Sequence, residues 1–474
     1  MTLHPDSEAN RTSIERVCDS FWEVEAKHSL LSWEVDGVFP WPLFRMQLYY
    51  KITQQVGLFD APHPLLKANK AAFDDAGKKE SRFSFWIRRN IRQVLNLAHR
   101  KFFGATDKPY GLLMGSGRGG VDLYTDALRK ELGSKAMLID RALNSERVDG
   151  SYHLGSMRST FRKLYQPKQP YRFAPEHQRI GDAIRQDLSR ALQTDVGDVG
   201  LECRRRTVDF LKLSTGFEEF FKVNPVETLF LSNSYNTTIS AALEGARRNG
   251  ARIVELQHGF ISRFHLGYSW PGRPYVPYRP DELWCFGDFW HESTPLPGQT
   301  KARVIGAPYV HELAGQHGGA RGDDLVMFSS QGVIGRRLFD VAVETARRRP
   351  EKQVLFRLHP NELLEDYEAV IATLGTIPAN FALSHKDPNI FALLSKTSIQ
   401  VGAFSTTLFE GMSLGCRTVV VDLPGCEYMR PVAQRGDVLF VRDVNELVAR
   451  LDDAPYAKDT EYYYAKPVTR LVGA

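Results

Sequence analysis

Residues 398–425, SIQVGAFSTTLFEGMSLGCRTVVVDLPG, combine two buried-strand patterns with a helix between them. Ser398–Val401 is a short apolar run, and Thr418–Val421 is a β-branched run typical of a strand buried in a parallel sheet. The loop Gly402–Thr407 leads into the predicted helix, which carries Glu410 in its first turn. A strand, a helix and a second parallel strand form the unit from which doubly wound sheets are built. The stretch therefore predicts an α/β fold.

The loop before this helix has the composition of an anion site. Ser405, Thr406 and Thr407 place hydroxyl groups beside the N–H groups of a helix N-terminus, where phosphate binds readily. The carboxylate of Glu410, one turn further on, could accept hydrogen bonds from sugar hydroxyls. The same residues also fit an ordinary crossover in which a Ser or Thr side chain only caps the helix. Taken alone, the loop leaves both interpretations open.

Alternating strand and helix patterns continue on both sides of this stretch, which predicts two Rossmann-like halves. Apolar runs that predict further strands occur at 111–115, 136–140, 227–233, 251–259, 282–287, 302–308, 325–332, 353–360, 380–384 and 438–441.

The predicted organisation has three parts and a tail. Residues 1–105 form a helical N-terminal extension, 106–311 a first Rossmann-like domain with an insertion at 141–215, and 323–455 a second Rossmann-like domain. The Gly-rich residues 312–322 are the predicted linker. Residues 456–474 form a tail that is expected to cross back onto the first domain.

Composition narrows the class of protein. A net charge of +5 over 474 residues argues against a nucleic-acid binder. Five scattered cysteines without a CxxC pair indicate neither a disulfide framework nor a zinc site, and favour a reducing cytoplasm. The polar N-terminus lacks an apolar signal core, and no apolar run reaches the roughly 18 residues that span a bilayer. We expect a cytoplasmic protein, at most peripheral at the inner face of the cell membrane.

A basic amphipathic helix is predicted at 82–103. Its apolar stripe includes Phe83, Ile87 and Ile91, and its other side carries a series of arginines. Such a helix suits a membrane surface or a partner, although a helix packed on its own domain shows the same pattern.

In addition to Ser405–Thr407, polar residues lie at the ends of predicted strands at three other places. Glu255, Gln257 and His258 lie at the end of one strand, and Arg357 and His359 at the end of another. Asp122 follows a glycine-rich loop after the first strand. Open α/β sheets bind ligands at the carboxyl ends of their strands, so these residues are candidates for one common site.

These motifs resemble those of GT-B-type glycosyltransferases of bacterial surface polysaccharides. The chain is similar to a loose superfamily that holds capsule Kdo- and sialyltransferases and CDP-glycerol glycerophosphotransferases. The resemblance rests on residues of about 225–425 and is carried by four motifs: Gln257-His258-Gly259, His265-x-Gly267-Tyr268, Arg357-x-His359-Pro360 and Ser405-Thr406-Thr407-x-x-Glu410-Gly411. It implies two Rossmann-like domains facing across a cleft, with a helical N-terminal extension.

The resemblance also implies a division of roles. The nucleotide and its phosphates would be held by Arg357, His359, Ser405, Thr406, Thr407 and Glu410. The acceptor would be bound by Gln257, His265 and Tyr268. His258 would face the reaction centre. The acidic motif that sialyltransferases use as a base has no clean match, so Glu255 and Asp122 are the nearest acidic candidates.

The expected reaction moves a sugar from a CMP-, CDP- or UDP-linked donor to a glycan or glycolipid acceptor, in capsule or O-antigen synthesis. Imidazole, guanidinium and helix N–H groups can stabilise the leaving phosphate without a metal, and no cofactor is expected. The aromatic loop Trp270–Tyr278 is a candidate for stacking on acceptor sugars, although exposed Tyr and Pro residues also suit a plain loop.

Three other functions fit the same pattern. A CDP-polyol phosphotransferase would use both histidines at phosphorus. A non-catalytic protein would only bind glycan or nucleotide. A nucleotide-sugar epimerase shares the two-domain shape.

Overall fold

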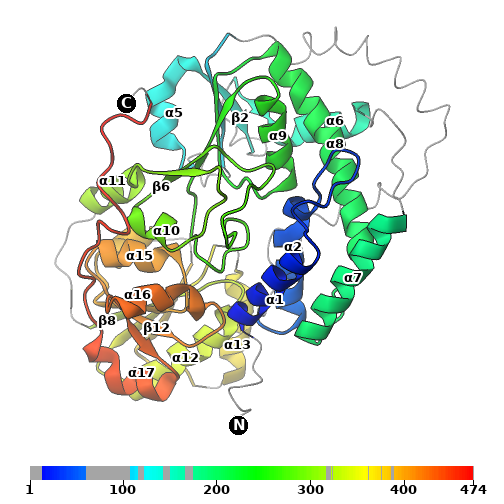
Figure 1. Ribbon diagram of the computed structural model, residues 1–474. Coiled ribbons are helices and arrows are strands. Elements are labelled where there is room, and N and C mark those ends of the chain that lie inside the picture. The colour runs from blue at the N-terminus through cyan, green and yellow to red at the C-terminus, as the bar shows by residue number, and fades with distance from the viewer. Residues whose placement is uncertain are drawn as a thin grey trace.

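The computed structural model describes residues 13–59, 107–115, 122–141, 150–165, 175–316, 322, 324–360, 362–374, 376–385 and 389–472. The chain forms two α/β units, the first in the upper part of Figure 1 and the second in the lower part. Each unit contains one parallel sheet with Rossmann-like strand order, and helices α1 (Ile14–Lys27) and α2 (Trp41–Gln55) precede the first unit. The predicted GT-B-type arrangement with a helical N-terminal segment is confirmed. The predicted helix 82–103 lies outside the described residues.

The first unit contains a seven-stranded parallel sheet of order β3-β2-β1-β4-β5-β6-β7. Its strands are β1 (Tyr110–Leu113), β2 (Ala136–Asp140), β3 (Tyr152–His153), β4 (Thr228–Leu231), β5 (Arg252–Leu256), β6 (Glu282–Cys285) and β7 (Lys301–Val304). Leu229 and Leu231 of β4 face helices α8 (Val199–Val223) and α9 (Thr237–Arg247), whereas Phe230 faces α5 (Asp126–Leu132). The strand order reverses between β1 and β4, which marks the switch point of this sheet.

The second unit contains a six-stranded parallel sheet of order β10-β9-β8-β11-β12-β13. Its strands are β8 (Leu325–Ser329), β9 (Gln353–Arg357), β10 (Phe381–Ser384), β11 (Ile399–Gly402), β12 (Arg417–Val421) and β13 (Leu439–Val441). Val326 and Phe328 of β8 pack with α12 and α17, and Met327 packs with α14. Both faces are buried, as the β-branched runs predicted. The switch point lies between β8 and β11.

The α-helices within the described residues cover both sheets and connect their strands. They are α1 (Ile14–Lys27), α2 (Trp41–Gln55), α5 (Asp126–Leu132), α6 (Leu154–Leu164), α7 (Pro175–Leu192), α8 (Val199–Val223), α9 (Thr237–Arg247), α10 (Asp288–Glu292), α11 (Pro308–Gln316), α12 (Gly335–Arg348), α13 (Leu364–Leu374), α14 (Ile390–Leu394), α15 (Thr406–Ser413), α16 (Arg430–Gln434) and α17 (Val444–Arg450). Short 3₁₀ turns lie at Gly133–Lys135, Cys426–Met429 and Leu451–Asp453.

Two details differ from the sequence-based expectations. The region 141–215, predicted as an insertion, holds helices but also contributes β3, which pairs with β2 through Ile139 and Tyr152. Two residues form no apolar run, so this edge strand leaves no pattern in the sequence. The predicted linker begins within α11, and its residues 317–321 lie outside the described part.

Helices α1 and α2 contact both units. In α1, Ser13 caps the helix and the face with Val17, Phe21 and Val24 is buried. The backbone N–H of Ile14 donates to Glu427 in the second unit at 3.0 Å. The Tyr49 hydroxyl lies 2.8 Å from that of Tyr428 in the same unit. One hydrophobic cluster contains residues of both helices and both units, so the four parts share a core.

The segment after α17 runs along the first unit, as the red trace at the edge of Figure 1 shows. The N–H of Ala465 donates to Phe286 O at 2.8 Å, and that of Val468 donates to Ile305 O at 3.1 Å. The N–H of Leu471 donates to the carboxylate of Glu131. Among the described residues, no helix is both long enough and apolar enough to span a bilayer.

Candidate functional site

Glu255 is the centre of the polar residues at the edge of the first sheet. It lies near the end of β5 and is fully buried. Its Oε1 accepts hydrogen bonds from the N–H groups of Asn233 (2.9 Å) and Ser234 (3.1 Å) and from the Tyr268 hydroxyl (2.6 Å). Burial raises the pKa of the Glu255 carboxyl group. One carboxylate thus ties the end of β5 to the β4–α9 loop and to the loop that follows β5.

His258 is connected to this carboxylate through Tyr268. Its Nδ1 lies 3.2 Å from the Tyr268 oxygen. Because the Tyr268 proton lies on the shorter bond to Glu255, the hydrogen-bond pattern assigns a proton to Nδ1 and a lone pair to Nε2. The ring keeps partial solvent contact. Desolvation, and secondarily the charge of Arg141, lower the pKa of His258 from 6.5 to about 4. The ring is therefore neutral at pH 7.

The three residues predicted to bind an acceptor are engaged within the protein. Gln257 is 1% exposed, donates from Nε2 to Gly259 O at 2.9 Å and accepts from the N–H of Phe286. Tyr268 is also buried. The Nδ1 of His265 accepts from the N–H of Gly267 at 3.2 Å, and burial lowers the pKa of His265 to about 3. In this conformation Gln257 and Tyr268 hold the loop rather than present free groups.

Asp122 follows β1 and serves as a hydrogen-bond acceptor for its own loop. Its Oδ2 accepts from the N–H of Gly115 and the hydroxyl of Thr125, both at 2.6 Å. The carboxylate therefore joins the end of β1 to the start of α5. Its neighbour Tyr124 contacts the His258 ring edge-on, with 6.5 Å between the ring centres. Glu255, His258 and Asp122 thus belong to one edge of the sheet.

In the second unit, Ser405 caps α15 at the switch point. Its Oγ accepts from the N–H of Thr407 at 3.2 Å, while Thr406 and Thr407 keep partial exposure on the first turn. Glu410 lies beyond the first turn, in contrast to its predicted position, because α15 begins only at Thr406. Its side chain is 6% exposed and accepts from the Tyr309 hydroxyl of the first unit at 3.1 Å.

Arg357 and His359 lie at the same edge of the second sheet, at the end of β9. Strand β8 separates β9 from β11, the strand that Ser405 follows. Arg357 is buried and donates from Nη1 to Ser384 Oγ at 2.8 Å. The N–H of His359 donates to Glu362 Oε2 at 2.5 Å. The strand order β9-β8-β11 places the His359 and Ser405 loops on either side of the β8–α12 loop.

Aromatic side chains bring the edges of the two units together. Phe260, two residues after His258, lies 5.4 Å from Phe409 of α15, measured between ring centres. Tyr124 lies 5.5 Å from Tyr309, and Tyr309 donates to Glu410. A continuous series of contacts therefore runs from His258 to α15.

The aromatic loop of the first unit fits its predicted use only in part. Trp270 is 1% exposed, and the Arg45 guanidinium lies 3.7 Å from its ring centre. Tyr278 is 6% exposed. Neither ring can stack on a sugar in this conformation, whereas Tyr275, at 67% exposed, can.

Sequence reasoning missed the β4–α9 loop, 232–236. Asn233 has φ of +66°, and its N–H, with that of Ser234, holds Glu255. The polar run SNSYN directly after an apolar strand was the available signal. Arg141, which follows β2 and donates to Ser232 O at 2.9 Å, was missed as well. Within the described residues, no group of three or more His, Cys, Asp or Glu side chains is placed to hold a metal ion.

No protein-family model matches the chain, and no curated protein matches it in sequence. Several solved structures are similar in fold. A UDP-GlcNAc 2-epimerase from Methanocaldococcus jannaschii is 10% identical, with 76% of this chain and 96% of that chain covered and a TM-score of 0.44. A UDP-GlcNAc 2-epimerase from Neisseria meningitidis bound to UDP-GlcNAc is 12% identical, with 75% of this chain and 96% of that chain covered and a TM-score of 0.45. A UDP-glucosyltransferase from Polygonum tinctorium is 13% identical, with 74% of this chain and 90% of that chain covered and a TM-score of 0.39. Similarities at this level say nothing about the substrate or reaction of this chain.

Proposed function

We propose that the chain is a glycosyltransferase that moves a sugar from a nucleotide-activated donor to a lipid-linked surface glycan in capsule or O-antigen synthesis. The observation that carries the proposal is the series of contacts joining the His258 loop to α15. Through Phe409 and Glu410, these contacts connect α15 of one unit to the loop of the other unit that carries a neutral imidazole. Three of the four motifs that resemble those of surface-polysaccharide glycosyltransferases lie on the loop after β5 or at α15, and the fourth, Arg357–Pro360, lies at the end of β9.

The second unit would bind the nucleotide. The N–H groups and hydroxyls of the first turn of α15 suit phosphate oxygens, and His359 lies at the same edge. Developing negative charge on the leaving phosphate would be stabilised by these donors. Glu410 would act from within the interface, because Tyr309 already binds its carboxylate.

The first unit would activate the acceptor. The acceptor hydroxyl would give its proton to Nε2 of His258 as its oxygen bonds to the anomeric carbon, and the nucleotide would leave with the electron pair of the broken bond. Tyr268 and Glu255 would hold the tautomer that this transfer requires. A pKa of about 4 keeps the ring unprotonated at neutral pH, the state from which it can accept a proton.

Nucleotide binding provides the first test. CMP, CDP, UDP, GDP and dTDP are added to the protein, and thermal denaturation is followed. One of them should stabilise the folded state, by about 2.7 kcal/mol at 100 times its Kd. The stabilisation should be lost in His359→Ala and Ser405→Ala, but kept in His28→Ala, which removes a histidine that connects the end of α1 to Asp187 of α7. Full affinity in both site variants would refute the site.

Product analysis provides the second test. The stabilising nucleotide is supplied as its sugar conjugate with a glycan acceptor, and products are identified by mass spectrometry. An acceptor heavier by one sugar supports the proposal. A phosphate-containing product, an isomerised sugar formed without acceptor, or binding without turnover would each replace it with one of the other functions.

A further inference from the structure

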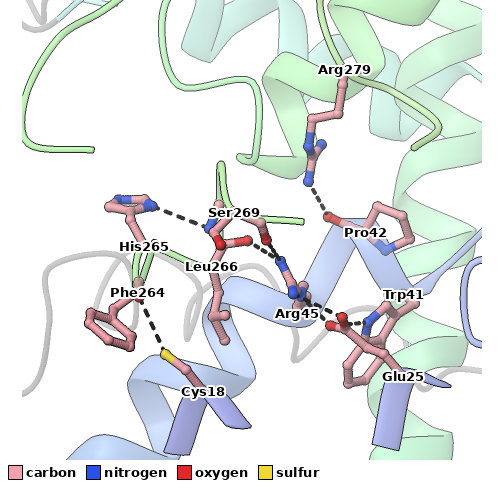
Figure 2. A network of polar contacts seen from close by, with 11 residues as sticks. Cys18, Glu25, Trp41, Pro42, Arg45, Phe264, His265, Leu266, Ser269 and Arg279 are labelled. Atoms are coloured by element: carbon pink, nitrogen blue, oxygen red, sulfur yellow. Dashed lines mark hydrogen bonds and ion pairs between the residues drawn. The ribbon is translucent and has the colours of Figure 1, made fainter. Parts of the chain in front are cut away.

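A fully buried arginine connects the N-terminal helices to the loop beside the candidate site. Arg45 of α2 is 1% exposed. Its guanidinium pairs with both carboxylate oxygens of Glu25 of α1, through Nε to Oε1 and through Nη2 to Oε2 at 2.9 Å. Its Nη1 donates to the carbonyls of Leu266 and Ser269, the latter at 2.8 Å. Figure 2 shows the guanidinium between the carboxylate and these carbonyls.

Further contacts fix the same loop from the same two helices. The Cys18 thiol of α1 lies 3.4 Å from Phe264 O. The Trp270 ring lies against the Arg45 guanidinium, and the Trp41 indole donates to Glu25 at 2.9 Å. The loop 264–270 therefore has three of its carbonyls bound by residues that precede it by more than 200 positions.

The planar guanidinium suits this task better than any other side chain. It presents five N–H donors in a fixed fork, and here it makes two bonds to a carboxylate and two to carbonyls. A lysine ammonium is compact and has three donors, so it cannot span Glu25 and both carbonyls at once. The site is specific for arginine rather than for a positive charge.

The two carbonyls bound by Arg45 lie on either side of Tyr268. Tyr268 donates to Glu255 and contacts His258 Nδ1. We propose that Arg45, held by Glu25, is a positioning residue: by fixing the loop 264–270 it places Tyr268 so that His258 keeps its reactive nitrogen as an acceptor. The inference rests on the proposed function for its chemistry, while its structural part, the control of the loop by Arg45, is independent of it.

The variant to make is Arg45→Lys, with Arg162→Lys as its matched control. Arg162 makes a two-bond pair with Asp209 at 2.5 and 2.6 Å, between α6 and α8 and away from the loop. Since Arg45→Lys can unfold the chain, Glu25→Gln is a second variant that leaves the guanidinium in place with a weaker anchor. All are compared with the wild type by hydrogen exchange, nucleotide affinity and turnover.

We expect amide exchange of Tyr268, Ser269 and Trp270 to rise at least about tenfold in Arg45→Lys, with a smaller rise in Glu25→Gln and none in Arg162→Lys. Turnover should fall by about 10²-fold with unchanged nucleotide affinity, because the nucleotide is assigned to the other unit. Loss of thermal stability alone, equal in Arg45→Lys and Arg162→Lys, would be a merely structural effect and would overturn the proposal.

The outcomes separate the two proposals. Unchanged loop exchange in both Arg45→Lys and Glu25→Gln overturns the positioning role, whatever the activity. Raised amide exchange of the loop in Arg45→Lys, together with turnover equal to that of the wild type, also overturns the positioning role. Absence of turnover in the wild type with every sugar nucleotide refutes the proposed function. The control of the loop by Arg45 is then judged on exchange alone, and a rise restricted to 264–270 supports it.

Discussion

Replacing Phe409 by alanine should weaken the connection between the two units. Phe409 belongs to α15 of the second unit and is fully buried. Most of its aromatic neighbours belong to the first unit or to the tail that packs on it, and their ring centres lie at these distances: Trp290 at 4.7 Å, Tyr463 at 5.1 Å, Phe260 at 5.4 Å and Phe289 at 5.6 Å. The ring therefore fills the contact between the units rather than the core of either.

The expected cost follows from these contacts. A buried Phe→Ala substitution costs about 3–5 kcal/mol, and four aromatic pairs at about 0.5–1.5 kcal/mol each are of the same order. A loss of about 3–5 kcal/mol changes the equilibrium constant of unfolding by roughly 10²- to 4 × 10³-fold. Phe339→Ala is the matched control, because Phe339 is equally buried but lies among Phe356, Tyr367 and Phe381 within the second unit.

Tryptophan fluorescence in urea separates the two variants. All seven tryptophans lie at or before position 290, so their emission reports on the first unit and the sequence before it. Phe409→Ala should lower the urea midpoint seen by fluorescence, although the substitution is in the second unit. Phe339→Ala should act mainly on the midpoint seen by circular dichroism. A fluorescence midpoint that Phe409→Ala leaves in place would refute the idea that this ring couples the units.

Two further predictions concern acid and the tail. The pKa values of His258 and His265 are lowered from 6.5 to about 4 and about 3. Below pH 6.5 the unfolded state therefore binds more protons than the folded state. The free energy of unfolding should be highest above that pH and decline as the pH falls towards 4. Urea midpoints at pH 7, 5.5 and 4.5 should show a smaller decline in the double His→Gln variant, and an equal decline would contradict the shifts. In Gly306→Ala, a residue with φ of +78° gains a Cβ that would lie 2.5 Å from Ala465 O, so the tail should detach and become sensitive to proteases. Gly250→Ala, with φ of +86° and no atom within 4 Å, controls for backbone strain alone and should leave the tail protected.

The sequence predicted the architecture well where the signal was local. β-Branched and apolar runs are a property of consecutive residues, and every run predicted as a strand corresponds to a strand of one of the two sheets. The cap at Ser405, one of the two interpretations that the sequence left open, is local as well, since it involves Thr407, only two residues away. Strand β3 was missed because two residues at a sheet edge carry no periodicity.

The candidate site was predicted only in part, since its contacts are not local. Trp270 looked available for stacking, but Arg45, 225 positions earlier, covers its ring. Glu410 looked available for ribose, but Tyr309 of the other unit binds it. Which loops follow which strands can be deduced from sequence, whereas the depth at which each side chain is buried depends on distant segments.

The position of the segment Tyr463–Leu471 affects the order in which the chain can fold during its synthesis. It is synthesised after the entire second unit, yet it covers part of the first: Trp290 donates from Nε1 to Tyr463 O at 2.6 Å, and Leu471 reaches Glu131. As the ribosome extends the chain, the first unit emerges early but keeps an uncovered aromatic surface until these last contacts form. A nascent chain arrested before residue 460 should therefore leave the sides of Phe289 and Trp290 that face Tyr463 uncovered and be retained by chaperones. Completion of the first unit is thus postponed until the second has been translated.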